Sequence, residues 1–219
     1  MFQTKMLAVA LVAIVSVLGI QAQSNPPTTC QTATGMTNVN ATLFAGDWYE
    51  EFRAPARNVS CVHIHVDVVN NQTQLKVMSM YSASQSGLLM DKNTQANVNI
   101  SEINANTGFN VTYNNTNGVN ATYKILSTDY NTNVVLCGFT NTNDPSTSFG
   151  VILTRKQIAN ATWLMEVKSN ASQILPGFND SSAANITQSI SCYANSATTS
   201  VPVLATLFAV FYALLKFAY

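Results

Sequence analysis

Short runs in which apolar and polar residues alternate, each ended by Asn, Gly, Ser or Asp, constrain the fold of this chain more than any other feature. The run CVHIHVDVV at residues 61–69 is the clearest. Because successive side chains of a strand point to opposite faces, such a run predicts a β-strand with one buried face. Short strands separated by turn residues indicate an antiparallel all-β domain. Nine runs are candidate strands: Trp48–Arg53, Cys61–Val69, Gln74–Tyr81, Gly87–Met90, Val98–Ile103, Gly108–Tyr113, Ala121–Ser127, Val134–Phe139 and Ser148–Thr154.

Eight or nine strands are enough for one closed barrel, and 219 residues allow one such domain. A single segment departs from the alternation. Between Ile158 and Ile174 the apolar residues recur at helical spacing, and Pro176 follows as a stop. The sequence therefore predicts one helix after the last strand, with Trp163 packed against the barrel wall.

The amino-terminal residues are typical of a cleaved signal peptide. A basic start at residues 1–5 precedes an apolar run at residues 6–20, and Ala22 offers a small residue for cleavage before Gln23. The run is short for a membrane span, which is the alternative interpretation. Residues 1–22 are therefore expected to be removed on secretion.

The carboxyl-terminal residues are typical of a glycosylphosphatidylinositol (GPI) attachment signal. Residues 203–219 are almost wholly apolar and follow small residues at Asn195 and Ser196 and a short polar spacer. The alternative is an ordinary tail-anchoring helix. We expect a mature domain at residues 23–195, a removed segment at 196–219 and tethering to the extracellular face of the plasma membrane, with a secreted form as the alternative.

Eleven Asn-x-Ser/Thr sequons indicate a glycoprotein, since a random arrangement of the same residues would give about five. Only 9% of the residues are charged and the net charge is zero, so glycans could keep the surface soluble. A net charge of zero also gives no indication of the basic surface that nucleic-acid binding requires. The sequons begin at Asn40, Asn58, Asn71, Asn99, Asn110, Asn114, Asn120, Asn160, Asn170, Asn179 and Asn185.

Four widely spaced cysteines predict two structural disulfides, with three possible pairings. They are Cys30, Cys61, Cys137 and Cys192, and no two of them form a C-x-x-C metal motif.

No motif for catalysis, cofactor binding or metal binding appears. Glu50 and Glu51 are adjacent, so in a strand they point to opposite faces and cannot form a paired acid and base. His63 and His65 share a face without a third strong ligand, and the apolar face of their strand is the other one. We therefore expect surface histidines, no metal, no cofactor and no enzyme.

Strand parity predicts which side chains face the barrel interior. A glycan cannot lie in a core, so Asn110 and Asn120 must point outward, which turns their neighbours inward. The expected interior is apolar with a few tyrosine hydroxyls, which suits a small hydrophobic ligand. The candidate wall residues are Ile64, Val66, Phe109, Val111, Tyr113, Tyr123 and Ile125.

Three segments resemble the motifs of the lipocalins. GDWYEEFRAP matches the first motif through Gly46 and Trp48, and GVILTRKQ matches the third through Arg155. STDYNTNVVLC matches the second motif through Thr128, Asp129 and Tyr130. The resemblance implies an eight-stranded antiparallel up-and-down β-barrel, the lipocalin calyx, with one carboxyl-terminal helix outside. It also implies that Arg155 lies over Trp48 at the closed end.

The resemblance narrows to the apolipoprotein D and bilin-binding branch through Cys61 and Cys137, and with the sequons and tail signal to a Lazarillo-type lipocalin. That branch implies the pairs Cys30–Cys137 and Cys61–Cys192. The implied function is binding of a lipid, retinoid, sterol or bilin. An adhesion glycoprotein with a cell-surface protein partner is the alternative. A lipocalin enzyme would require a reactive interior thiol.

Overall fold

The computed structural model describes residues 28–88, 90–103, 106–115 and 119–192. The predicted signal peptide and the predicted GPI site at residues 195–196 lie outside these residues. Eight strands follow one another around the barrel in the order β4-β3-β2-β1-β8-β7-β6-β5, all antiparallel. They are β1 (Gly46–Ala54), β2 (Ser60–Val69), β3 (Gln74–Ser82), β4 (Lys92–Asn99), β5 (Phe109–Val111), β6 (Ala121–Thr128), β7 (Asn133–Phe139) and β8 (Ser148–Thr154).

The barrel is nearly closed between β4 and β5. Ala96 of β4 forms an isolated bridge with Tyr113, two residues beyond the end of β5, and the Asn114 amide donates to the Gln95 carbonyl oxygen at 2.9 Å. The predicted fold class, an eight-stranded antiparallel barrel with a following helix, is therefore confirmed.

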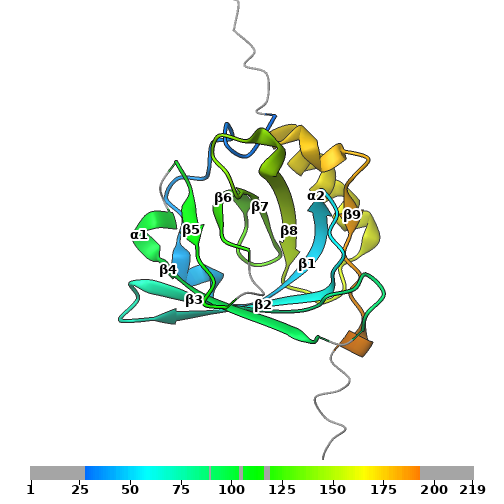
Figure 1. The fold of residues 1–219 in the computed structure, drawn as a ribbon, viewed down its shortest axis with the longest axis horizontal. Helices are drawn as coiled ribbons and strands as arrows, with labels where there is room; N and C mark the ends of the chain where they lie inside the picture. Colours follow the sequence, from blue (N-terminus) through cyan, green and yellow to red (C-terminus); the bar gives the residue numbers. More distant parts are fainter. Residues whose placement is uncertain (1–27, 89, 104–105, 116–118, 193–219) are drawn as a thin grey trace, which may run out of the picture.

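Five shorter elements and one long helix complete the described chain. In Figure 1, α2 (yellow) lies outside the ring of strands, beside β1 and β8. The remaining elements are η1 (Ala41–Phe44), α1 (Ile100–Ile103), η2 (Pro145–Thr147), α2 (Ala161–Ile174), η3 (Pro176–Asn179) and β9 (Ala184–Asn185). The short β9 pairs with β1 on the side where β2 has diverged.

Helix α2 covers one side of the barrel through an apolar cluster. Leu164, Val167 and Ala171 of the helix pack with Phe52 and Ile152 of the barrel wall. The partly buried Trp163 joins this cluster, as predicted. The helix begins after Asn160, whose side chain accepts a hydrogen bond from the Trp163 amide and so caps it.

Two of the nine predicted strands were wrong in whole or in part. The described residues of the expected strand at 87–90 lie in no strand, because the Gly87 amide closes a turn on Ser84 and the Ser60 hydroxyl donates to the Gly87 carbonyl oxygen. The expected strand at 98–103 begins at Lys92 and ends at Asn99, and residues 100–103 form α1. The buried face of β4 includes Thr94 and Ala96, so the alternation of apolar and polar residues in this part of the sequence is weak.

Two disulfides fasten the ends of the described chain to the barrel. Cys30 pairs with Cys137 of β7, and Cys61 of β2 pairs with Cys192. This is the pairing that the lipocalin resemblance implied. All four cysteines are thereby used, so the reactive thiol that the enzyme interpretation requires is not present in this structure.

Candidate ligand-binding site

The interior of the barrel holds a cavity of about 400 Å³. Every barrel strand contributes lining side chains, and most of them are apolar. A volume of this size falls in the range of small-molecule sites. All seven residues that strand parity predicted as wall residues line this cavity: Ile64, Val66, Phe109, Val111, Tyr113, Tyr123 and Ile125.

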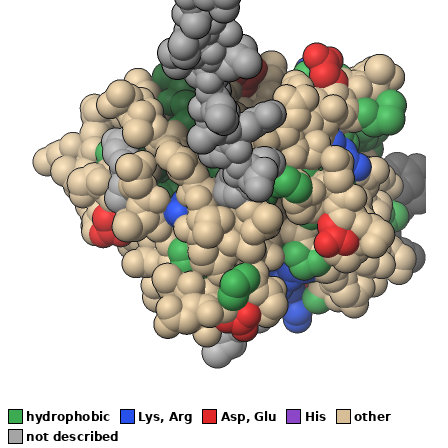
Figure 2. Space-filling view, turned by 90° about the horizontal axis from the view of Figure 1, so that it is seen from above, with side chains coloured by type: hydrophobic (Ala, Val, Ile, Leu, Met, Phe, Trp, Pro, Cys, Tyr) green, Lys and Arg blue, Asp and Glu red, His purple; other side chains and the backbone are tan. Residues whose placement is uncertain are grey.

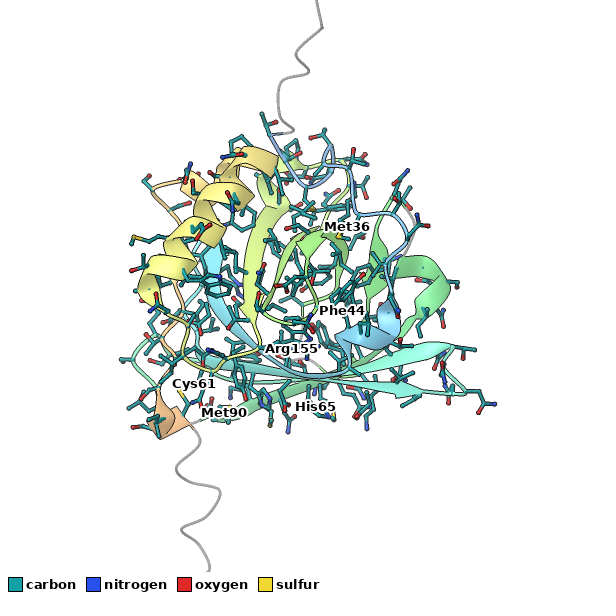
Figure 3. All side chains as sticks on the ribbon, turned by 180° about the vertical axis from the view of Figure 1, so that it is seen from behind. Met36, Phe44, Cys61, His65, Met90 and Arg155 are labelled. Carbon is teal, nitrogen blue, oxygen red and sulfur yellow. A yellow bond between two sulfur atoms is a disulfide. The ribbon has the colours of Figure 1, made fainter. Side chains whose placement is uncertain are left out.

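One end of the cavity is closed by the three motif segments. Trp48, 1% exposed, lines the cavity there and donates from its indole nitrogen to the Phe44 carbonyl oxygen at 2.9 Å. The Arg155 guanidinium carbon lies 3.7 Å from the centre of the Trp48 ring. Figure 3 shows Arg155 and Phe44 at this closed end. The position that the resemblance implied for Arg155 is therefore confirmed.

The second motif forms the turn that supports this floor. The Asp129 carboxylate accepts hydrogen bonds from the amides of Asn131, Thr132 and Asn133 at 2.8–3.1 Å. Tyr130 has a φ of 62°, and its carbonyl oxygen accepts from Arg155 Nε at 3.0 Å. The Asp129 bonds therefore hold the turn in the shape that presents this carbonyl oxygen to Arg155.

Both the backbone conformation and the limited space at position 46 require a glycine. Its φ is +97°, a region that favours glycine, and a Cβ atom there would lie 3.2 Å from Arg155 Nη1. A larger residue would strain the start of β1 and press on the Arg155 guanidinium.

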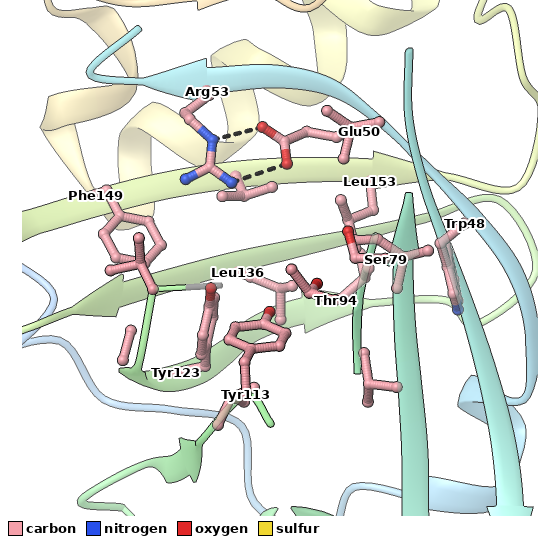
Figure 4. A pocket seen from close by; sticks show the side chains of 18 of the residues that line it. Trp48, Glu50, Arg53, Ser79, Thr94, Tyr113, Tyr123, Leu136, Phe149 and Leu153 are labelled. Carbon is pink, nitrogen blue, oxygen red and sulfur yellow. Dashed lines mark hydrogen bonds and ion pairs between the residues drawn. The ribbon is translucent and has the colours of Figure 1, made fainter. Parts of the chain in front are cut away.

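A buried ion pair lines the cavity wall, and the sequence did not predict it. Arg53 donates from Nε to one carboxylate oxygen of Glu50 at 2.5 Å and from Nη2 to the other at 2.8 Å (Figure 4). Glu50 is 2% exposed and Arg53 is 9% exposed. Burial by itself would lower the pKa of Arg53, but the charge and hydrogen bonds of Glu50 outweigh it and raise that pKa.

A β-bulge in β1 brings these two side chains together. In a regular strand, residues three apart point to opposite faces. The pairing of β1 with β8 shifts register between Glu50 and Phe52, which adds one residue to the β1 side. Glu50 and Arg53 consequently both line the cavity, while Phe52 packs outside against Phe178 at 6.1 Å between ring centres. A bulge depends on pairing with a distant strand, so no local pattern would have revealed it.

Two tyrosines bring further polar atoms into the cavity. Figure 4 shows the hydroxyls of Tyr113 and Tyr123 pointing to the side of the cavity where the ion pair lies. Tyr123 stacks on Phe109 and meets Phe149 edge-on, with ring centres 6.1 and 5.5 Å apart. Burial raises the pKa of both tyrosines, so both hydroxyls are protonated and can donate hydrogen bonds at neutral pH.

Glu51 points away from the cavity, as its adjacency to Glu50 predicted. Its carboxylate accepts from the Ala159 amide at 3.2 Å and from the Thr154 hydroxyl at 3.5 Å, between the barrel wall and the segment leading to α2. Burial raises the pKa of Glu51 to about 7. Glu51 therefore belongs to the outer packing and not to the binding site.

The two histidines lie on the outer face of β2, as parity predicted, and Figure 3 shows His65 pointing away from the barrel. Asp47 Oδ1 lies 2.8 Å from His63 Nε2 and 2.7 Å from His65 Nδ1. The hydrogen bond with Asp47 raises the pKa of His65. Within the described ranges, no three His, Cys, Asp or Glu side chains are grouped so that they could hold a metal ion.

The sequon asparagines all lie at the surface, since each of the eleven is exposed. Asn110 and Asn120, whose outward direction fixed the parity argument, are among them. Figure 2 shows one face of the molecule on which charged side chains are few and scattered. Through the described part of the chain, no helix is both long and apolar enough to cross a membrane.

Three of the solved structures that share this fold come from a lobster, the tobacco hornworm and cockroaches. Lobster apocrustacyanin A1 is 16% identical, with a TM-score of 0.53, and the match covers 78% of this chain and 97% of that one. Insecticyanin from the tobacco hornworm Manduca sexta is 15% identical, with a TM-score of 0.54, over 76% and 89% of the two chains. The cockroach allergen Per a 4 is 20% identical, with a TM-score of 0.50, over 74% and 97%.

No protein-family model and no curated protein sequence matches the chain. At these identities the structural likeness establishes the fold, which is the lipocalin fold that the three motifs predicted.

Proposed function

We propose that this protein binds a small hydrophobic molecule inside its barrel and carries or holds it without changing it chemically. The observation that supports the proposal is the 400 Å³ cavity, which is mostly apolar, is lined by all seven predicted wall residues and is closed at one end by Trp48. Burial of an apolar ligand there would remove its surface from water, the dominant favourable contribution to such binding.

We further propose that the protein is a tethered extracellular glycoprotein of the apolipoprotein D and bilin-binding branch. The two disulfides have the pairing that this branch implies, and all eleven sequons are exposed. The proposed signal peptide and the proposed GPI signal are inferred from the sequences of the two ends of the chain. Release from intact cells by a phosphatidylinositol-specific phospholipase tests the anchor, since a peptide helix would resist that enzyme.

Binding can be followed with the tryptophan that the cavity itself contains. Trp48 lines the cavity, whereas Trp163 lies on α2 outside the barrel, so a Trp163→Phe variant leaves a single interior reporter. The whole chain is expressed in glycosylating cells, and the mature, delipidated protein is titrated with fatty acids, retinoids, sterols and bilins. We expect saturable quenching of Trp48 fluorescence at micromolar or lower concentration for one class.

A cavity-filling variant shows whether the quenching comes from the barrel. Leu136 lines the cavity and is half-buried, so Leu136→Phe places a ring in the open space. Leu43 is 49% exposed, and Leu43→Phe is the matched control. Binding should weaken in the first variant only. If a correctly folded protein responds to no ligand in the panel, the proposed carrier function is wrong and the adhesion alternative is favoured.

The adhesion alternative would be favoured by a barrel whose interior is filled by its own side chains. The described barrel instead contains an open cavity. Glycans and a tether fit both functions, so ligand binding is the measurement that separates them.

A further inference from the structure

The ion pair in the cavity wall restricts the chemistry of a ligand, an inference that rests on the proposed ligand-binding function. Glu50 and Arg53 are joined by two hydrogen bonds within the cavity lining. Because one carries a negative and the other a positive charge, the buried part of the site has no net charge. A second buried charge of either sign would have no partner of its own.

A ligand carboxylate would be poorly accommodated beside this pair. It would lose its hydration on entering the cavity, which is strongly unfavourable for a buried ion without compensation. Arg53 already has its counter-charge in Glu50 at 2.5–2.8 Å, and the Glu50 carboxylate would repel a second anion. Arg57 also lines the cavity, but it lies in the exposed connection between β1 and β2, where water screens its charge.

A neutral oxygen has suitable partners at the same place. A guanidinium has five N–H donors, and Glu50 accepts from Nε and from one hydrogen of Nη2, which leaves three for another acceptor. The hydroxyls of Tyr113 and Tyr123 lie on the same side of the cavity and can donate or accept (Figure 4). The rest of the lining is mostly apolar, although Ser79 and Thr94 add two more hydroxyls (Figure 4).

We propose that the cavity selects uncharged amphipathic ligands, whose apolar body fills the barrel while a single hydroxyl or carbonyl oxygen binds at Arg53, Tyr113 and Tyr123, and that it discriminates against free carboxylates. Fatty alcohols, retinol and sterols belong to the favoured class. Ionised fatty acids, retinoic acid and bilins with free propionates belong to the disfavoured class.

Matched pairs of probes that differ only in the head group test this selectivity. Retinol and retinoate, and hexadecanol and hexadecanoate, are titrated at pH 8 into the mature Trp163→Phe protein with Trp48 as reporter. We expect the alcohol of at least one pair to bind at least about tenfold more tightly than the acid. Equal or tighter binding of both acids would overturn the inference while leaving the carrier function standing.

Glu50→Gln removes one charge of the pair and leaves the guanidinium without a counter-charge. The expected result is loss of the preference for alcohols, in which the carboxylate probes gain about tenfold in affinity and the alcohols change little. Glu51→Gln is the matched control, because the same chemical change on the opposite face of β1 should leave the selectivity unaltered. An unchanged preference in a folded Glu50→Gln protein would contradict the inference.

If Glu50→Gln does not fold, the comparison of alcohol and carboxylate probes on the wild-type protein still tests the selectivity. Failure of these probes and of every sterol and bilin in the wider panel to bind the wild-type protein would instead reject the proposed carrier function, and this inference with it. Failure of the inference and failure of the function therefore give different results.

Discussion

The guanidinium carbon of Arg155 lies 3.7 Å from the centre of the Trp48 ring, and this contact joins the residue that follows the last barrel strand to the first strand. The same guanidinium donates to four carbonyl oxygens, those of Leu43, Ala45, Asp47 and Tyr130, at 2.8–3.0 Å. One side chain thus holds together the amino-terminal segment, the start of β1 and the turn between β6 and β7.

Replacement of Arg155 by lysine should therefore destabilise the protein despite the retained charge. A lysine ammonium cannot reproduce the planar fork or the stacking on indole, so we expect a loss of about 2–4 kcal/mol in the free energy of unfolding. Urea denaturation measures the loss, and a red shift of Trp48 fluorescence would report a loosened floor. Lys156→Ala, at the exposed next position, should change stability by less than about 0.5 kcal/mol. Equal effects of the two substitutions would contradict this account.

The raised pKa of Glu51 makes the stability of the protein depend on pH. Burial raises this pKa from 4.5 to about 7, so the folded protein binds more protons than the unfolded chain between these values. Stability attributable to Glu51 is then fully present below pH 4.5 and is lost as the pH rises to about 7.

Glu51→Gln should remove that dependence. We expect the variant to be more stable than the wild type by about 1–2 kcal/mol at pH 8, and to differ little from it at pH 4.5. Denaturation midpoints at the two pH values measure the difference. Glu166→Gln, at an exposed position of α2, should change the stability by the same small amount at both pH values. A wild-type advantage at pH 8 would show that the Glu51 carboxylate stabilises the fold when ionised.

The two disulfides should contribute similar amounts to stability although they join different elements. They connect residues 107 and 131 positions apart, and the entropy of closing a loop depends only on the logarithm of its length. The chain-entropy account gives roughly 4–5 kcal/mol for each. We expect the double variants Cys30→Ser with Cys137→Ser and Cys61→Ser with Cys192→Ser to lose stability to a similar extent in urea. A loss confined to one pair would mean that local packing, and not chain entropy, dominates.

Asn160 serves two purposes that substitution can separate. Its Oδ1 atom accepts from the Trp163 amide at 3.1 Å and caps α2, while its side-chain nitrogen is the atom that a glycan would modify. Thr162→Val removes the sequon and keeps the cap, whereas Asn160→Ala removes both. Mass spectrometry should show the same loss of one glycan in each variant. Only Asn160→Ala should also lose about 0.5–2 kcal/mol in a denaturation measurement.

A good part of the site followed from local patterns. Alternation places Ile64 and Val66 on one face of their strand whatever the rest of the chain does, so parity predicted the wall of the cavity correctly. The Gly-x-Trp segment and Arg155 identified the floor by resemblance, and the same resemblance gave the disulfide pairing. Such features could be predicted because each depends on a short stretch of chain or on a recognisable motif.

The polar chemistry of the site was decided by the tertiary structure. Parity alone puts Glu50 and Arg53 on opposite faces, and only the register shift against β8 brings both into the cavity. The burial of Glu51 depends on the chain segment that leads into α2, and the bounds of β4 depend on its pairing with β3 and on its bridge to Tyr113. The sequence therefore determined an apolar barrel with a closed floor, while contacts between distant segments decided which charges lie inside it, because a bulge and a buried carboxylate exist only when those segments meet.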